Sequence, residues 1–295
     1  SSEIVEKRVV SLSPAITQII LDLDRGDALV GVTKDDPVAP DDVAVVGSMF
    51  GEGLDYEKLL TINPTHIMMQ YSAKGMPQKL DNLAMEHDWQ IHTYRLETLS
   101  DIADAIYDKH DPTGSISGIL GMPVAGADIV SPFRRLGSDI ENIPIGASTQ
   151  YDVLMLSSIA EPIVAVGRDT FLHELLTLVN GKNVLEATGY PVVDREKILA
   201  TQPQVMIILR SDATDISDAD IESFRQSISD LDIPAVDRGY IKVVTDPAAK
   251  LPSSSAFDLL NPLLDILQEV EASEVAQQFS DNGNDNVADD MPEAP

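Results

Sequence analysis

Three basic side chains in this sequence stand where a predicted strand gives way to a loop, and such side chains can bind an anionic small molecule. Arg168, Arg210 and Lys250 belong to a set of 20 basic residues in a chain of 295. A guanidinium group holds a carboxylate or phosphate group through two parallel hydrogen bonds, whereas an ammonium group holds it as a point charge. The competing interpretation is that each cation pairs with an acidic neighbour in the sequence, namely Asp169, Asp212 or Asp246. The sequence leaves both interpretations open.

Patterns typical of catalysis or metal binding do not occur in the sequence. It contains no Gly-x-Ser-x-Gly elbow, no phosphate-binding loop and no Gly-x-Gly-x-x-Gly after a strand. There is no cysteine, which excludes disulfides and thiolate chemistry. The five histidines lack zinc-type spacing, and the acidic stretch 212–222 lacks the glycine and terminal glutamate spacing of a calcium loop. We therefore expect a protein that is not an enzyme and that carries no metal and no cofactor.

The charge balance also narrows the classes of partner. There are 49 acidic and 20 basic residues, a net charge of −29 and a pI near 4.2, which disfavour binding to nucleic acid and to anionic membrane surfaces. No apolar run reaches the roughly 18 residues that a membrane span needs. The chain begins Ser1-Ser2 without a leader, and we expect any signal or anchor to have been removed or to lie outside this sequence. The missing leader therefore does not argue for the cytoplasm, and we expect a periplasmic or other extracytoplasmic protein that is a monomer.

The elements that position the three cations alternate between strand and helix along most of the chain. Apolar runs such as 8–12, 29–33 and 66–70 predict strands, and amphipathic or capped segments between them predict helices. This alternation favours an α/β fold with mostly parallel sheets. We predict four segments in chain order: an N-terminal α/β lobe over 1–122, a connecting helix over 123–142, a C-terminal α/β lobe over 143–272, and an acidic, disordered tail over 273–295.

An internal repeat supports the division into two lobes. Residues 54–72 and 193–211 align with a shift of 139, so that Asp55 matches Asp194, Glu57 matches Glu196 and a Pro-Pro match follows. Each copy predicts a short helix, a proline break and an apolar strand that ends in a polar loop. Chance similarity between two αβ units is the alternative, and the equivalent place of both copies within their lobes argues against it.

Two such lobes would place their ligand-binding residues on loops. In open α/β sheets, ligands bind beyond the carboxyl ends of the strands, and two facing lobes would form one cleft. We therefore predict that the ligand-binding residues are Ser13, Asp36, Phe50, Tyr71, Arg168, Tyr190, Arg210 and Lys250. Tyr94 and Asp169 are further loop candidates.

Four stretches resemble the helix-linked class of ABC-importer substrate-binding proteins, which take up ferric siderophores, haem, cobalamin and some metal ions. They are RVVSLSPAITQIIL followed by DALVGVT, then LDYEKLLTINPTHIM, GRDTFLHELLTLVNGKNV and VDREKILATQPQVMII, and the resemblance covers about residues 8–270. It implies two Rossmann-like lobes joined by a single long helix, here 123–142, with the ligand cleft between them. It also implies that one glutamate on each lobe docks on an ABC permease, and these positions match Glu57 and Glu196.

Within this family the sequence resembles the pattern of the cobalamin-binding member, although Gln70 and Val164 replace aromatic residues that it carries. A haem-binding member needs a Tyr or His ligand from a cleft loop, for which Tyr71 is the candidate. The predicted function is capture of a metal chelate or corrinoid (cobalamin, ferric siderophore or haem) and delivery to a permease. The alternatives are a ligand sensor or adaptor of the same fold without a transporter, and a two-domain α/β metal-dependent enzyme.

Overall fold

The computed structural model describes residues 7–34, 36–49, 53–139, 148–212, 215–247 and 249–284, and its contacts divide the chain into two compact units. Unit 1 comprises Ser1–Asn142, Asp169–Glu174 and Lys250–Phe257, and unit 2 comprises Ile143–Arg168, Leu175–Ala249 and Asp258–Pro295. Within the described part of the chain, no helix is both long and apolar enough to cross a membrane.

Unit 1 is built on a five-stranded parallel sheet with the strand order β3-β2-β1-β4-β5. Its strands are β1 (Val9–Ser11), β2 (Leu29–Val32), β3 (Ala44–Val45), β4 (His66–Gln70) and β5 (Gln90–Tyr94). Its helices are α1 (Pro14–Asp22), α2 (Tyr56–Ile62), α3 (Gln78–Glu86), α4 (Leu99–Ile106), α5 (Ile116–Ile119) and α6 (Pro123–Asp139), with a 3-10 turn η1 (Gly26–Ala28) after α1.

The sequence explains these elements locally. The central strand β1 is buried throughout, as expected of a parallel strand covered on both faces. On one face, Val10, Ile67 and Met69 pack with Leu59 of α2 and Leu80 of α3 in one hydrophobic cluster. Proline at the first position of α1 and a capping box at Thr98 of α4 start those helices, because both features suit the unpaired amides of a helix start.

Unit 2 contains a six-stranded, mostly parallel sheet with the order β11-β10-β6-β7-β9, and β8 also pairs with β6. Its strands are β6 (Tyr151–Ser158), β7 (Ile163–Ala165), β8 (Gly181–Asn183), β9 (Val192–Val193), β10 (Val205–Arg210) and β11 (Ile241–Thr245). Its remaining elements are α7 (Phe171–Leu178, whose first turn belongs to unit 1), α8 (Arg195–Thr201), α9 (Asp218–Ser227), α10 (Pro234–Asp237), the 3-10 turn η2 (Ser254–Leu259, mostly in unit 1) and α11 (Leu260–Asn284). The predicted α/β class with two Rossmann-like sheets is thus confirmed.

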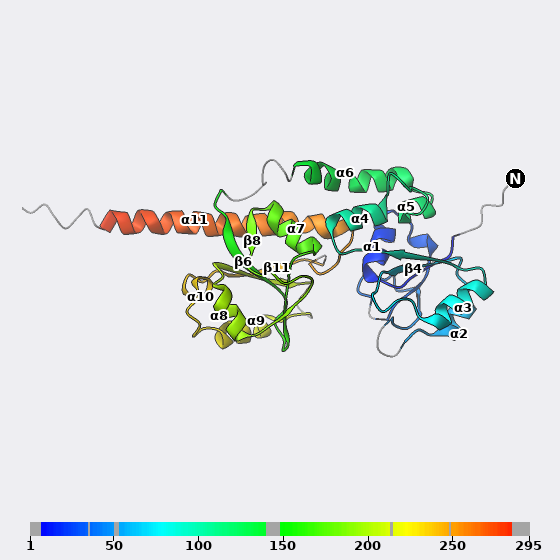
Figure 1. Cartoon of the computed structure of the whole chain (residues 1–295), viewed down its shortest axis with the longest axis horizontal. Helices are drawn as coiled ribbons and strands as arrows, with labels where there is room; N and C mark the ends of the chain where they lie inside the picture. Colours follow the sequence, from blue (N-terminus) through cyan, green and yellow to red (C-terminus); the bar gives the residue numbers. More distant parts are fainter. Residues whose placement is uncertain are drawn as a thin grey trace, which may run out of the picture. The chain divides into compact units, whose positions relative to one another are not determined.

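The predicted connecting helix corresponds to α6, which continues through Pro132 to Asp139. Residues 140–142 of that prediction lie outside the described residues. In unit 1, α6 packs against α4 and α5, and Figure 1 shows the three helices together.

Two segments that we expected in the C-terminal lobe belong to unit 1 instead. Residues 169–174 and 250–257 group with unit 1 by their contacts, so Asp169 and Lys250 are not part of the second lobe. The main-chain amide of Leu99 donates a hydrogen bond of 2.6 Å to the Glu174 carboxylate, and Ser254 donates to the Asp22 carboxylate. These polar contacts join positions far apart in sequence, which local patterning does not reveal.

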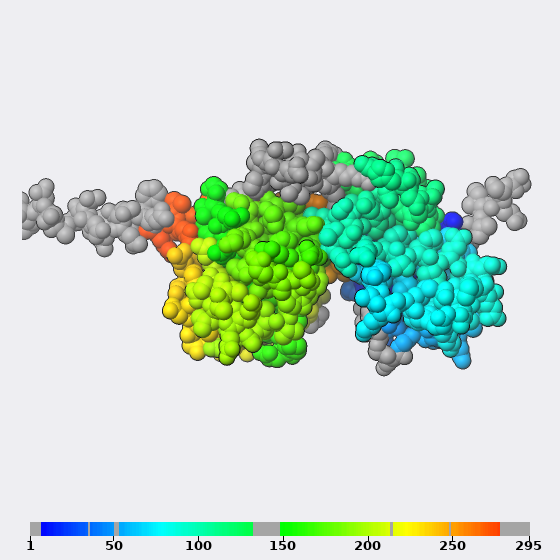
Figure 2. All heavy atoms as spheres, in the orientation of Figure 1, coloured from blue at the N-terminus to red at the C-terminus, as the bar shows by residue number. Residues whose placement is uncertain are grey.

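The acidic tail predicted from residue 273 is wrong as far as residue 284, because α11 includes residues 273–284. The physical reason is a set of contacts between α11 and the rest of unit 2. Glu271 accepts hydrogen bonds from the main-chain amides of Ser148 and Thr149, and Glu274 accepts one of 3.1 Å from the Tyr151 hydroxyl. Figure 2 shows the orange atoms of this part of α11 against the green and yellow atoms of unit 2.

Candidate functional site

The carboxyl edge of the sheet in unit 1 carries several of the predicted ligand-binding residues. The strand order changes direction between β1 and β4, since β2 and β3 lie on one side of β1 while β4 and β5 lie on the other. Such a switch point leaves room for a ligand beyond the strand ends. Ser13 follows β1 and Tyr71 follows β4, so these two predicted residues border it.

Ser13 and Asp36 are held together by Thr17 of α1. The Thr17 hydroxyl lies 2.8 Å from the Asp36 carboxylate and 3.2 Å from the main-chain oxygen of Ser13. Burial raises the pKa of Asp36, although hydrogen bonds from Thr17 and from the main chain oppose the rise. Ser13 is almost fully buried. This pair therefore forms a polar, largely buried base beyond the ends of β1 and β2 rather than an exposed binding surface.

Tyr71 and Arg95 form the exposed part of this edge. The main-chain amide of Tyr71 donates a hydrogen bond of 2.7 Å to the carbonyl oxygen of Tyr94, which brings the ends of β4 and β5 together. The guanidinium carbon of Arg95 lies 4.5 Å from the centroid of the Tyr71 ring, a cation–π arrangement. Tyr71 is 45% exposed. The edge thus offers an aromatic ring, a phenol oxygen and a cation within one small area.

The sequence prediction missed Arg95 and chose its neighbour Tyr94 instead. Tyr94 is buried, its hydroxyl donates a hydrogen bond of 3.1 Å to the carbonyl oxygen of Gly114, and burial together with Asp111 raises its pKa well above the usual range. It is therefore a structural residue. The signal for Arg95 was available, because it directly follows the strand 90–94 and strand-end position was the rule that selected the other candidates.

A cavity of about 300 Å³ adjoins Arg95 at the carboxyl end of β5. Its lining is strongly acidic and comprises Thr93, Tyr94, Arg95, Asp101, Asp104, Ala105, Asp108, Asp111 and Gly114. Two of these carboxylates have local structural roles, because Asp101 completes the capping box of α4 and Asp111 accepts from the amide of Gly114. Among the described residues, no group of three or more His, Asp or Glu side chains is arranged to hold a metal ion.

The cations predicted in unit 2 are engaged in ion pairs, though not with the neighbours that the sequence suggested. Arg168 pairs with Glu186 at 2.7 Å, and Arg210 pairs with Asp218 at 2.6 Å. Arg210 also donates a hydrogen bond of 2.6 Å to the Thr245 hydroxyl, so it ties the ends of β10 and β11 together. Its side chain is only 18% exposed, which favours a structural role over ligand contact.

The other predicted ligand-binding residues are spread over both units. Tyr190 is 49% exposed in unit 2, and hydrogen bonds between the main chains of 167–168 and 187–189 hold it near Arg168 in that unit. Lys250 is partly buried in unit 1. Phe50 lies outside the described residues.

Glu57 and Glu196, the predicted docking residues, occupy equivalent positions in their units. Each lies exposed in the first turn of a seven-residue helix whose N-cap is an aspartate: Asp55 accepts from the amide of Lys58 at 2.9 Å, and Asp194 from that of Lys197 at 2.8 Å. Each helix ends at a residue with a left-handed backbone, Asn63 or Gln202. The chain then passes through a proline into an interior strand of the sheet, β4 in unit 1 and β10 in unit 2. The repeat in the sequence is therefore a repeat in structure.

His66 is a core residue, as expected for a histidine inside a strand. Its ring stacks on that of His92 with centroids 5.4 Å apart, and its Nδ1 lies 2.8 Å from the Thr65 hydroxyl. Burial, with Lys7 and His92 nearby, lowers the pKa of His66 to about 4. Both rings are neutral near pH 7 and serve packing.

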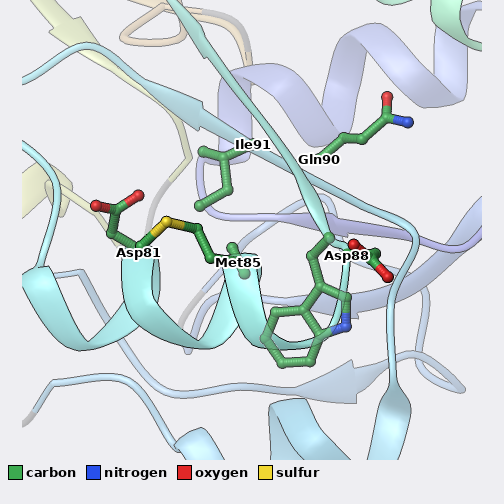
Figure 3. Close-up of a pocket in the computed structure, with 7 residues that line it drawn as sticks. Asp81, Met85, Asp88, Gln90 and Ile91 are labelled. Carbon is green, nitrogen blue, oxygen red and sulfur yellow. The ribbon is translucent and has the colours of Figure 1, made fainter.

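A second cavity in unit 1, of about 590 Å³, lies between α3 and the start of β5 (Figure 3). It is lined by Asp81, Ala84, Met85, Asp88, Trp89, Gln90 and Ile91. None of the predicted site residues lines it. It lies at the amino end of the sheet, away from the strand ends where α/β proteins bind ligands.

Comparison with known proteins extends these observations. The family model for "periplasmic binding protein" matches residues 9–248. A vitamin B12-binding protein of Vibrio cholerae is 26% identical over 202 residues, covering 68% of this chain and 69% of that protein. An uncharacterized ABC transporter substrate-binding lipoprotein of Bacillus subtilis is 25% identical over 207 residues, covering 68% of this chain and 63% of the relative.

Solved structures show the same fold. A periplasmic haem-binding protein from Roseiflexus sp. RS-1 matches with a TM-score of 0.69 and 20% identity, covering 89% of this chain and 99% of that one. The periplasmic vitamin B12-binding protein of Vibrio cholerae matches with a TM-score of 0.65 and 21% identity, covering 90% and 98%. At these identities the likeness is one of architecture.

Proposed function

The chain belongs to the periplasmic binding protein family, and from this premise we propose that it captures a metal chelate outside the cytoplasm and delivers it to the permease of an ABC importer. The ligand is a cobalamin, a haem or a ferric siderophore. Relatives and structural neighbours named for vitamin B12 and haem support this range of ligands.

The observation that carries the ligand class is the exposed pair Tyr71–Arg95 at the carboxyl ends of β4 and β5, beside the switch point of unit 1. A phenol oxygen can bind ferric iron, as it does in some haem proteins. The ring face that Arg95 does not cover can pack against a flat macrocycle, and the guanidinium group can hold a carboxylate or other anionic oxygen at its edge. Metal chelates of these types combine an apolar or planar body with anionic groups, which this pair matches.

Delivery requires a contact with the permease, for which Glu57 and Glu196 are the proposed residues. Both carboxylates are exposed, and both stand on helices fixed by the same caps. An exposed glutamate in the first turn of a helix also interacts favourably with the helix dipole, so the presence of one such residue does not by itself indicate a docking site. Their equivalence in two units is what supports a shared partner with basic groups.

Titration calorimetry with haemin, cyanocobalamin and a ferric hydroxamate tests the ligand class, with the iron-free hydroxamate, glucose and a mixture of amino acids as controls. We expect one metal chelate to bind with a Kd of about 1 μM or tighter, which corresponds to roughly −8 kcal/mol. Binding of a sugar or an amino acid, with no response to any chelate, would falsify the proposed substrate class.

A further inference from the structure

Leu60 and Leu199 are exposed leucines at equivalent positions of the repeat. Leu60 lies on α2 of unit 1 and is 41% exposed; Leu199 lies on α8 of unit 2 and is 40% exposed. Each follows the predicted docking glutamate of its helix by three residues. Residues three apart on a helix are neighbours on its surface, so each helix presents a carboxylate beside an apolar side chain.

The orientation of both helices is set by the residue before each leucine. Leu59 is fully buried in the core of unit 1, and Ile198 is fully buried in that of unit 2. One residue further along a helix is a rotation of about 100°, so Leu60 and Leu199 turn away from those cores toward the surface. Core packing therefore does not account for the exposed part of either leucine.

Helix stability does not require leucine at these positions either. Lysine, glutamate and glutamine have similar helix propensities and would avoid exposing apolar surface. One exposed leucine on a protein surface is common and needs no explanation. The same residue with the same exposure in both units, beside equivalent glutamates, points to a shared requirement.

We infer that Leu60 and Leu199 are apolar contacts to the permease, one on each unit, and that each acts beside the glutamate of its helix. This inference rests on the proposed function. The partner surface then offers, at two places, a basic side chain next to an apolar pocket. An interface contact of this kind gains most of its affinity from the buried apolar anchor, while the charges at its edge guide association.

The test measures binding of the protein, loaded with whichever of haemin, cyanocobalamin or the ferric hydroxamate it binds in the titration above, to the permease through which it supports uptake of that compound, held in lipid nanodiscs. The variants are Leu60→Gln, Leu199→Gln and the double variant, with Leu60→Met and Leu199→Met as conservative replacements. Val124→Gln in unit 1 and Val275→Gln in unit 2 are matched controls, because both valines are exposed and lie on other helices. Thermal melting of each variant, and its ligand affinity, verify that the fold is intact.

We expect each leucine-to-glutamine change to weaken permease binding about tenfold and the double change about 100-fold, with wild-type affinity for the methionine variants and the valine controls. Wild-type binding by the leucine variants would overturn the inference. In that case the double variant Glu57→Lys/Glu196→Lys separates two outcomes. If the glutamate variant loses binding, the two glutamates dock on the permease and the leucines do not contribute. If its binding is unchanged, the proposed docking through Glu57 and Glu196 is wrong as well.

Discussion

The guanidinium carbon of Arg95 lies 4.5 Å from the centroid of the Tyr71 ring, and the two residues come from the ends of neighbouring strands. Arg95 also approaches Glu97 at 3.8 Å, an exposed pair worth little in water. The guanidinium group therefore remains available to an anionic ligand while it stays positioned over the ring. In the proposed function, this relationship places the ligand chemistry of unit 1 in two side chains.

Replacing either member of this pair should weaken ligand binding by different routes. Tyr71→Phe keeps the ring and removes the phenol oxygen, so we expect a large loss, about 100-fold, only for a ligand whose iron the oxygen binds. Arg95→Gln removes the cation, and we expect about tenfold weaker binding of any chelate that carries anionic groups. Calorimetric titration of both variants checks this, with Arg195→Gln in unit 2 as a control at an exposed arginine paired to Asp230. Unchanged affinity in both variants contradicts the assignment.

The buried histidine His66 should make folding stability depend on pH. Its pKa in the folded protein is lowered to about 4, whereas an unfolded chain keeps about 6.5. Well above pH 6.5 the histidine is neutral in both states and no penalty arises. As the pH falls from 6.5 to 4, the unfolded state takes up the proton first, so stability is lost, by about 3 kcal/mol in total.

Urea unfolding at several values between pH 7 and pH 4 measures this loss. His66→Gln should reduce the pH dependence relative to the wild type, and His110→Gln, a change at an exposed histidine, should retain it. The pKa of His92 is also lowered by burial and by Lys7, so the double variant His66→Gln/His92→Gln should flatten the curve further. Equal slopes for wild type and His66→Gln would contradict the interpretation of His66 as a buried neutral residue.

The net charge of −29 should make the protein more stable in salt. Repulsion among carboxylates acts over tens of ångströms in dilute buffer and over a few ångströms at 1 M ionic strength. We expect the thermal midpoint at pH 7 to rise by about 5 °C between 0.05 and 1 M NaCl, an effect of order 1–2 kcal/mol. Near pH 4.2, the pI, the same salt step should change the midpoint much less. A fall at pH 7 would mean that ion pairs such as Arg210–Asp218 outweigh the repulsion.

The final turns of α11 should contribute to the stability of unit 2. Tyr151 is 1% exposed, burial and Glu274 raise its pKa to about 12, and its hydroxyl donates to Glu274, which also accepts from Arg238. Glu274→Gln should lower the free energy of unfolding by about 1 kcal/mol, and truncation after residue 272 by more. Glu222→Gln, at an exposed position of α9, is the matched control. A truncated chain that is as stable as the full chain would restore the interpretation of this segment as a loose tail.

The predictions from sequence succeeded where the residues of a single helix or strand are enough to identify that element. The alternation of apolar runs and capped helices was enough to predict two α/β units, and the 139-residue shift placed Glu57 and Glu196 on matching helices. Those helices are recognisable because an N-cap aspartate and a proline break act within a few residues of chain. The burial of His66 was also predictable from sequence, because the residue lies within an apolar strand.

Contacts between distant segments were decided only in the tertiary structure. Arg210 contacts Asp218 and Thr245 instead of its sequence neighbour Asp212. The buried Tyr94 hydroxyl donates to the carbonyl oxygen of Gly114, and the Arg95 guanidinium lies over the Tyr71 ring. Likewise, residues 169–174 and 250–257 join unit 1, and α11 continues past residue 272 because Tyr151 and Arg238 meet Glu274. The sequence by itself determined the elements, their order and their repetition, since periodicity and capping are local. The partner of each polar side chain was decided by packing, because charges and hydrogen-bonding groups pair with whatever the fold brings near them.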